Sequence, residues 1–95
     1  MANLILSRQA EADLDDIWLY IAEDNLENAN RYLNKLHDKA LMLSENPEIG
    51  VLRPELAEGL RTFPVDNYIL YYLLQKDCVE LVRVFHGSRD ISMLF

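Results

Sequence analysis

The stretch LRTFPVDNYILYYLLQKDCVELVRVF, from Leu60 to Phe85, decides the fold. It holds three runs of apolar and aromatic residues, and polar pairs at 66–67 and 76–77 separate them. Runs of this length and composition, bounded by turn residues, are typical of β-strands. Asp and Asn also tolerate the positive φ of a tight turn. The stretch therefore predicts three strands, 60–65, 68–75 and 78–85, which form an antiparallel meander. The last run is apolar on both faces except for Glu80 and Arg83, which indicates a strand away from the sheet edge.

Upstream, the pattern changes from strand to helix. Residues 4–6 read as a short strand, and Ser7 is a suitable N-cap for a helix from Arg8 to Glu23. One apolar stripe repeats every three or four residues, at Ala10, Leu14, Ile17, Trp18 and Ile21. Its early turns are rich in Asp and Glu, which suit the positive end of a helix dipole.

A second helix follows closely. Asp24-Asn25 interrupts the first helix and can cap the next, whose apolar stripe continues to Leu43. Asn46-Pro47 should end it near Glu45. Two helices joined so tightly must form an antiparallel hairpin. Residues 47–59 are then a loop, and residues 54–58 and 89–95 each have room for one helical turn.

The elements combine into one α+β domain spanning residues 1–95, in the order β-α-α-β-β-β. A hairpin with an apolar face must cover a sheet, so we expect it on one face of a mainly antiparallel sheet. We expect Trp18 to seal the hairpin onto that sheet. Tyr68, Tyr71 and Tyr72 are expected to pack in the core and across strands rather than stack on bases.

Composition and charge restrict the possible functions. The chain has 95 residues and a net charge of −7, and its first half is the more acidic. This charge repels nucleic acid, so direct nucleic-acid binding is not expected. The single cysteine, Cys78, excludes an internal disulfide and fits a reducing cytosol. No signal peptide or membrane span is indicated, and we expect a cytoplasmic protein.

Motifs for metal or nucleophilic chemistry are weak. His37 and His86 have no cysteine pair near them to give ligand spacing, so neither a metal nor a cofactor is expected. None of the serines lies in a nucleophile-elbow context. The remaining candidates are Arg61, Arg83, His86 and Arg89. They either form ion pairs with Glu80, Asp66 or Asp90, or they line a small basic groove.

Four motifs in the correct order resemble the RelE/ParE superfamily of toxins, and its ParE-like branch in particular. The motifs are AEADLDDIWLYIAE at 10–23, LSENPEIGVLRPELAEGLR at 43–61, NYILYYLL at 67–74 and RVFHGSRDI at 83–91. The resemblance covers nearly the whole chain, and that family's fold has the element order derived above.

The resemblance implies the toxin of a type II toxin–antitoxin pair, which poisons DNA gyrase by binding and has no catalytic residues. It also implies a partner, a ParD-like antitoxin whose extended segment folds on the toxin. The residues expected to contact the target or the partner are Arg61, Arg83, His86, Arg89, Trp18 and Leu14.

Two alternatives remain. A RelE-like enzyme would cut messenger RNA on the ribosome, with Arg61, Arg83 and His86 as catalytic groups. Against this, the tail SRDISMLF has neither the tyrosine nor the lysines typical of that branch, and the chain is acidic. The second alternative, motivated by the same acidity, is a relative that binds an antitoxin without being toxic.

Overall fold

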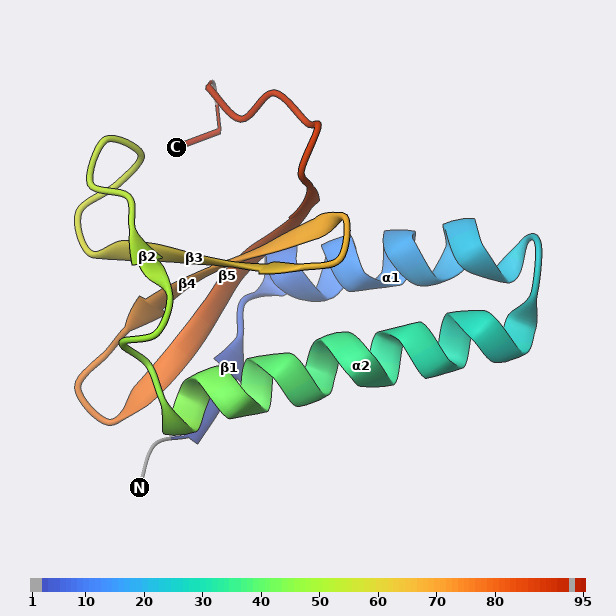
Figure 1. Ribbon diagram of the computed structural model, residues 1–95, viewed down its shortest axis with the longest axis horizontal. Coiled ribbons are helices and arrows are strands. Elements are labelled where there is room, and N and C mark those ends of the chain that lie inside the picture. Colours follow the sequence, from blue (N-terminus) through green and yellow to red (C-terminus); the bar gives the residue numbers. More distant parts are fainter. Residues whose placement is uncertain (1–2, 93) are drawn as a thin grey trace.

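The computed structural model describes residues 3–92, 94 and 95 (Figure 1). The strands form one sheet in the order β1-β5-β4-β3-β2, with β1 parallel to β5 and the other neighbours antiparallel. The predicted α+β class and the meander of β3 to β5 are confirmed, and β2 is a short strand that lies inside the predicted loop. The elements are β1 (Asn3–Leu6), α1 (Arg8–Ala22), α2 (Leu26–Glu45), β2 (Val51–Leu52), β3 (Leu60–Val65), β4 (Tyr68–Leu74) and β5 (Cys78–His86).

Side-chain caps start both helices where the sequence predicts. Ser7 Oγ accepts a hydrogen bond from the Ala10 amide at 2.9 Å, and Asn25 Oδ1 accepts one from the Asn28 amide at 3.0 Å. Each cap satisfies one of the amide groups that a helix start leaves without a partner. α2 ends at Glu45, before Asn46-Pro47, as expected. In the described part of the chain no helix is long and apolar enough to cross a membrane.

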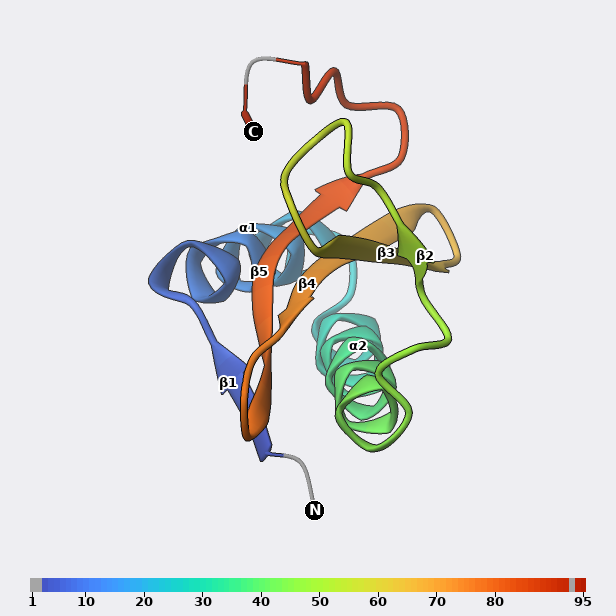
Figure 2. The same ribbon diagram turned by 90° about the vertical axis from the view of Figure 1, so that its left-hand side faces the viewer.

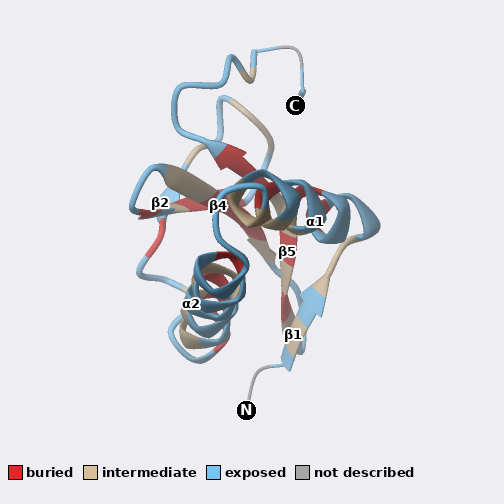
Figure 3. Cartoon of the chain, turned by 90° about the vertical axis from the view of Figure 1, so that its right-hand side faces the viewer, coloured by how far each residue is buried: buried red, intermediate tan, exposed pale blue. Residues whose placement is uncertain are grey.

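The hairpin of α1 and α2 covers one face of the sheet, and its far half extends beyond the strands (Figure 1). Buried residues from both helices and from β3, β4 and β5 meet in this main core, which Figure 3 shows as the red inner faces. Leu36, Leu43 and Tyr72 are among its fully buried side chains. Apolar burial of this kind contributes about 1.5–3 kcal/mol for each large side chain.

The opposite face of the sheet has a smaller core of its own. Leu60, Tyr71 and Phe85 are buried there, and they pack against Leu56 and Ile91 from the loop and the tail. Figure 2 shows that loop and tail lie at the same end of the molecule. Residues 54–58 form a turn, whereas the described tail residues make bends and turns rather than a helix. The predicted tail segment 89–95 includes Met93, which lies outside the described residues.

Tyr72 links the sheet to the loop after α2, and this link can be tested. Its hydroxyl donates to Pro47 O at 2.7 Å and accepts from the Gly50 amide at 2.9 Å, and the side chain is 0% exposed. Tyr72→Phe leaves that buried amide without a partner, so the free energy of unfolding should fall by about 1–3 kcal/mol. Urea unfolding measures this. Tyr20→Phe, at a side chain 75% exposed, is the matched control. Equal urea midpoints for the two variants would contradict the role of the hydroxyl.

Candidate functional site

A largely buried ion pair joins α1 to β5. Arg83 Nε donates to Asp13 Oδ2 at 2.8 Å, and Arg83 Nη2 donates to Asp13 Oδ1 at 2.9 Å. The Val84 amide also donates to Asp13 Oδ2 at 2.9 Å. The hydrogen bonds that Arg83 donates to Asp13 are the main cause that raises the pKa of Arg83. Asp13 is therefore the main acceptor for this part of β5, and not simply one of the acids that suit the helix dipole.

The ion pair lies where β5 loses its neighbouring strand. β1 pairs with β5 only as far as Leu6 and Leu81. Beyond that point the Ser7 amide donates to Leu81 O at 3.0 Å, and Ser7 Oγ donates to Val82 O at 2.7 Å. Asp13 then accepts from Val84. Because buried backbone groups must be paired, the start of α1 replaces the missing strand at this edge.

Arg61 lies apart from the other predicted cations. It pairs in register with Tyr72, which faces the helices, whereas Arg83 pairs with Tyr71, which faces the smaller core. The two arginines are thus on opposite faces of the sheet. Arg61 Nη1 donates to Gly50 O at 2.8 Å and to Glu48 O at 3.3 Å, so it holds the loop after α2.

The predicted carboxylate partners of these arginines were wrong. Glu80 accepts a hydrogen bond from Gln75 instead, and Asp66 forms an ion pair with Lys35. Asp90 accepts from the Ser92 amide. The prediction considered acids on or near the sheet, whereas the acid that Arg83 binds comes from α1 and is separated from it by 70 positions in the sequence.

Arg83, His86 and Arg89 do come together. The Cζ atoms of Arg83 and Arg89 lie 4.3 Å and 4.4 Å from the centroid of the Phe85 ring. His86 and Arg89 line a shallow hollow of about 190 Å³ with Asp16, Tyr20 and other residues. The Ser88 amide donates to His86 Nδ1 at 3.2 Å, and Ser88 Oγ lies 2.7 Å from the same nitrogen, so Ser88 holds the ring in place.

Leu14 and Trp18 occupy the helical hairpin. Leu14 is half-buried and lines a hollow of about 320 Å³ between the helices, beside Leu33. The Trp18 indole N–H donates to Asn30 Oδ1 at 2.8 Å, so its polar end connects α1 to α2. The expectation that Trp18 seals the hairpin onto the sheet was wrong, because Ile17 and Ile21 of α1 contact the main core in its place.

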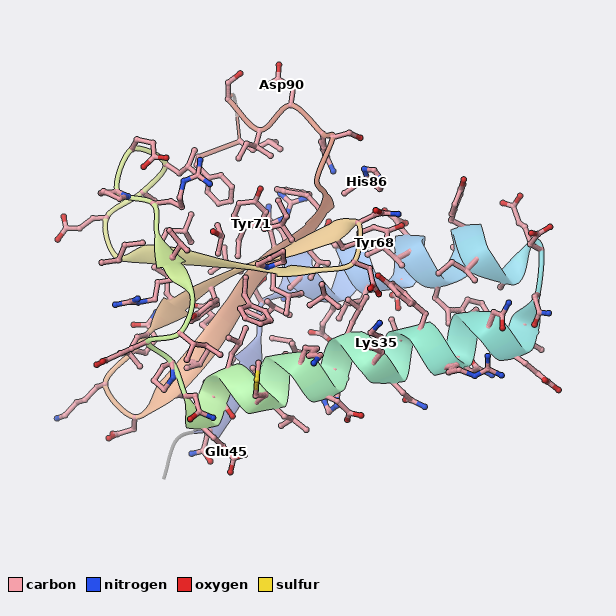
Figure 4. The ribbon with its side chains drawn as sticks, in the orientation of Figure 1. Lys35, Glu45, Tyr68, Tyr71, His86 and Asp90 are labelled. Carbon is pink, nitrogen blue, oxygen red and sulfur yellow. The ribbon has the colours of Figure 1, made fainter. Side chains whose placement is uncertain are left out.

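Sequence reasoning missed a hollow on the described surface whose lining includes three tyrosines. It measures about 560 Å³ and opens where the hairpin passes the β3–β4 turn. Figure 4 shows Tyr68 and His86 beside each other at this point. Tyr20 was overlooked because it lies off the apolar stripe of α1, and its 75% exposure is known only from the structure. The lining residues are Tyr20, Ile21, Tyr32, Asp66, Asn67, Tyr68 and His86.

Comparisons with known proteins identify the class. The family model described as the ParE toxin of the type II toxin–antitoxin system parDE matches residues 4–91. Toxin ParE1 of Caulobacter vibrioides is 36% identical over 86 residues, which is 90% of this chain and 88% of that protein. Toxin ParE3 of the same organism is 30% identical over 93 residues, covering 97% and 93%. The chain belongs to the ParE toxin family of type II toxin–antitoxin systems.

Solved structures agree on the fold. A chain from the chromosomal ParDE system of Pseudomonas aeruginosa superimposes with a TM-score of 0.77 at 22% identity, covering 90% of this chain and 96% of that one. A chain from the toxin–antitoxin complex RelBE2 of Mycobacterium tuberculosis gives a TM-score of 0.69 at 26% identity, with the same coverage. The family match and the two Caulobacter relatives confirm the resemblance found in the four motifs.

The Asp13–Arg83 pair should dominate the stability of the β5 edge. Arg83→Met leaves a mostly buried carboxylate without its cation, so the free energy of unfolding should fall by about 3 kcal/mol. Arg89→Met is the control, since Arg89 contacts the same Phe85 ring but is exposed. It should cost less than about 1 kcal/mol. Urea unfolding followed by circular dichroism compares the two, and similar losses would contradict the assignment.

The Tyr32 phenol should ionise only at unusually high pH. Burial in the first place, and then Asp66, raises its pKa from 10.0 to about 12. The unfolded chain ionises this phenol at its ordinary value. The neutral Tyr32 phenol therefore makes its full contribution to the free energy of unfolding below pH 10, and this contribution is lost as pH rises toward 12. Burial also raises the pKa of Tyr68, Tyr71 and Tyr72, so a spectrophotometric titration should show several late-ionising phenols, and one fewer in Tyr32→Phe. A wild-type curve with no late phenol would contradict this.

Proposed function

We propose that this ParE toxin acts by binding DNA gyrase and stabilising its cleaved complex with DNA, without catalysis of its own. The observation that carries the proposal is that Arg61 and Arg83 are both already bound within the protein. Cleavage of RNA at neutral pH needs cations that are free to stabilise the charged phosphorane. Arg83 is already held by Asp13, and Arg61 by two backbone carbonyls. This favours binding over a RelE-like reaction.

The exposed part of the site is suited to a protein contact. His86 and Arg89 are exposed at the end of β5, and Arg89 is held over Phe85. Arginine fixed on an aromatic ring keeps its outward N–H groups available and loses little conformational entropy on binding. We assign His86 and Arg89 to the target-binding surface, and Arg61 and Arg83 to positioning the loop and the strand behind it.

Gyrase assays test the proposal. Purified chain should increase gyrase-dependent cleavage of supercoiled DNA, and Arg89→Ala should raise the half-effective concentration about tenfold. Lys76→Ala is the matched control, because it removes an exposed cation from the β4–β5 turn. No effect on gyrase or on topoisomerase IV at stoichiometric excess would refute the target. New cuts in translated messages that disappear in His86→Ala would favour the RelE-like alternative.

We further propose a ParD-like antitoxin as the partner. The relatives in solved structures come from ParDE and RelBE2 systems, which supports such a pairing. Two surfaces suit an extended segment that folds on binding. The hollow beside Leu14 and the Trp18 edge of the hairpin suit apolar side chains. The outer edge of β1, with Ile5 51% exposed, suits an added strand.

Expression without the partner gene tests toxicity itself. Growth should stop, and co-expression of the neighbouring antitoxin should restore it. Normal growth with soluble, folded chain present would favour the non-toxic alternative. A monomeric chain with no affinity for the neighbouring gene product would refute the antitoxin partner.

A further inference from the structure

The hollow of about 560 Å³ has mainly aromatic walls, and we call it the tyrosine pocket. The residues that define it are Tyr20, Tyr32, Tyr68, His86 and Asp66. Its residues come from both helices, the β3–β4 turn, and the ends of β4 and β5. The rings of Tyr32 and Tyr68 are 5.8 Å apart, and those of Tyr68 and His86 are 5.4 Å apart, measured between centroids. Tyr20 is 75% exposed, which is much exposure for a large ring.

The pocket has the electrostatics of a cation site. Burial is the main cause that raises the pKa of both Tyr32 and Tyr68, so the phenols stay neutral at physiological pH. Lys35 lowers the pKa of Asp66, which stays a carboxylate. Aromatic faces carry the negative side of the ring quadrupole and attract ammonium or guanidinium groups. Neutral phenol oxygens and a carboxylate can accept hydrogen bonds from the same group.

The cation now at Asp66 is replaceable. Lys35 Nζ lies 2.7 Å from Asp66 Oδ2, with both side chains 47% exposed, and Figure 4 shows Lys35 reaching toward the β3–β4 turn from α2. Exposed pairs of this kind contribute only about 0–1 kcal/mol. Arg31, on this side of α2, donates to Asn28, and Lys39 has only a small effect on the pKa of Asp66. A guest cation can therefore share or take over Asp66 at little cost.

The residues around the pocket indicate which kind of partner would supply the guest cation. Asp16 lines the hollow on one side of the pocket, and Glu23 and Asp24 line another, with Tyr20 common to all three. The whole chain has a net charge of −7. An acidic partner would be repelled by this surface, so we expect the segment that binds here to be basic.

We propose that the tyrosine pocket binds an arginine or lysine side chain from a basic segment of the antitoxin. This rests on the proposed function, since it names the chemistry by which the partner recognises this toxin. The pocket is larger than one such side chain, so the cation enters with its stem against Ile21 and the rings. The segment continues over the acidic end of the hairpin.

A small probe tests the chemistry of the pocket without any partner. Isotope-labelled chain is titrated with N-acetyl-arginine methylamide, and with the citrulline analogue as the uncharged control. The ring signals of Tyr20, Tyr32 and Tyr68 should shift and saturate in the millimolar range with the first compound only. Tyr20→Ala should abolish the effect. Leu26→Ala, at a residue 57% exposed near the tip of the hairpin, should preserve it. Equal shifts with both compounds, or none at these rings, would overturn the inference.

A second experiment tests the occupant. Calorimetry with the purified neighbouring antitoxin should show about tenfold weaker binding for Tyr20→Ala and less than about twofold for Leu26→Ala. If the antitoxin binds wild type and Tyr20→Ala equally, the inference fails and the proposed function stands. If Tyr20→Ala loses only the effect on gyrase, the pocket belongs to the target, and the assignment to the antitoxin is overturned. If no antitoxin binds while the arginine probe does, the proposed partner fails together with its assigned occupant.

Discussion

The carboxylate of Asp13 is the contact on which the rest of the structure depends. It accepts two hydrogen bonds from Arg83 and one from the Val84 amide, and it does so from a helix lying across the unpaired edge of β5. Without it, a buried amide and a partly buried guanidinium would both lack this partner at the same place. The contact fixes where α1 lies on the sheet. The position of α1 in turn sets the direction of the hairpin and the place of Tyr20 above the β3–β4 turn.

A local irregularity makes this contact possible. The pairing of β4 with β5 passes from Tyr71–Arg83 to Tyr72–Leu81 and skips Val82. Such a bulge turns the following side chains relative to the regular alternation. After it, Val84 faces the main core while Phe85 faces the smaller one, and Arg83 can reach α1 at the sheet edge. Strand, bulge and helix therefore act together to place both arginines in structural roles and to leave His86 and Arg89 exposed.

The elements could be predicted from the sequence because their signals are local. Ser7 and Asn25 begin the helices, Asn46-Pro47 ends the second, and the turns at 66–67 and 76–77 separate the strands. The site could be predicted only in part. Asp13 looks like any acid in the first turns of a helix until it is known that α1 crosses an open sheet edge. The two residues of β2 are too few to give a periodic signal. The tyrosine pocket joins residues whose closeness arises from the tertiary fold alone.

The pairing of β1 with β5 also determines when the sheet can be completed during synthesis of the chain. Among the described strands β1 is made before the others, and its neighbour in the sheet is β5, which is made after them. Contacts between distant segments form only once both are available. During synthesis the hairpin and the meander can begin to form, but the edge that Ser7 and Asp13 complete stays open until β5 has left the ribosome. The surface around His86 and Arg89 can be completed only after β5 has been made, so a shorter nascent chain cannot present it.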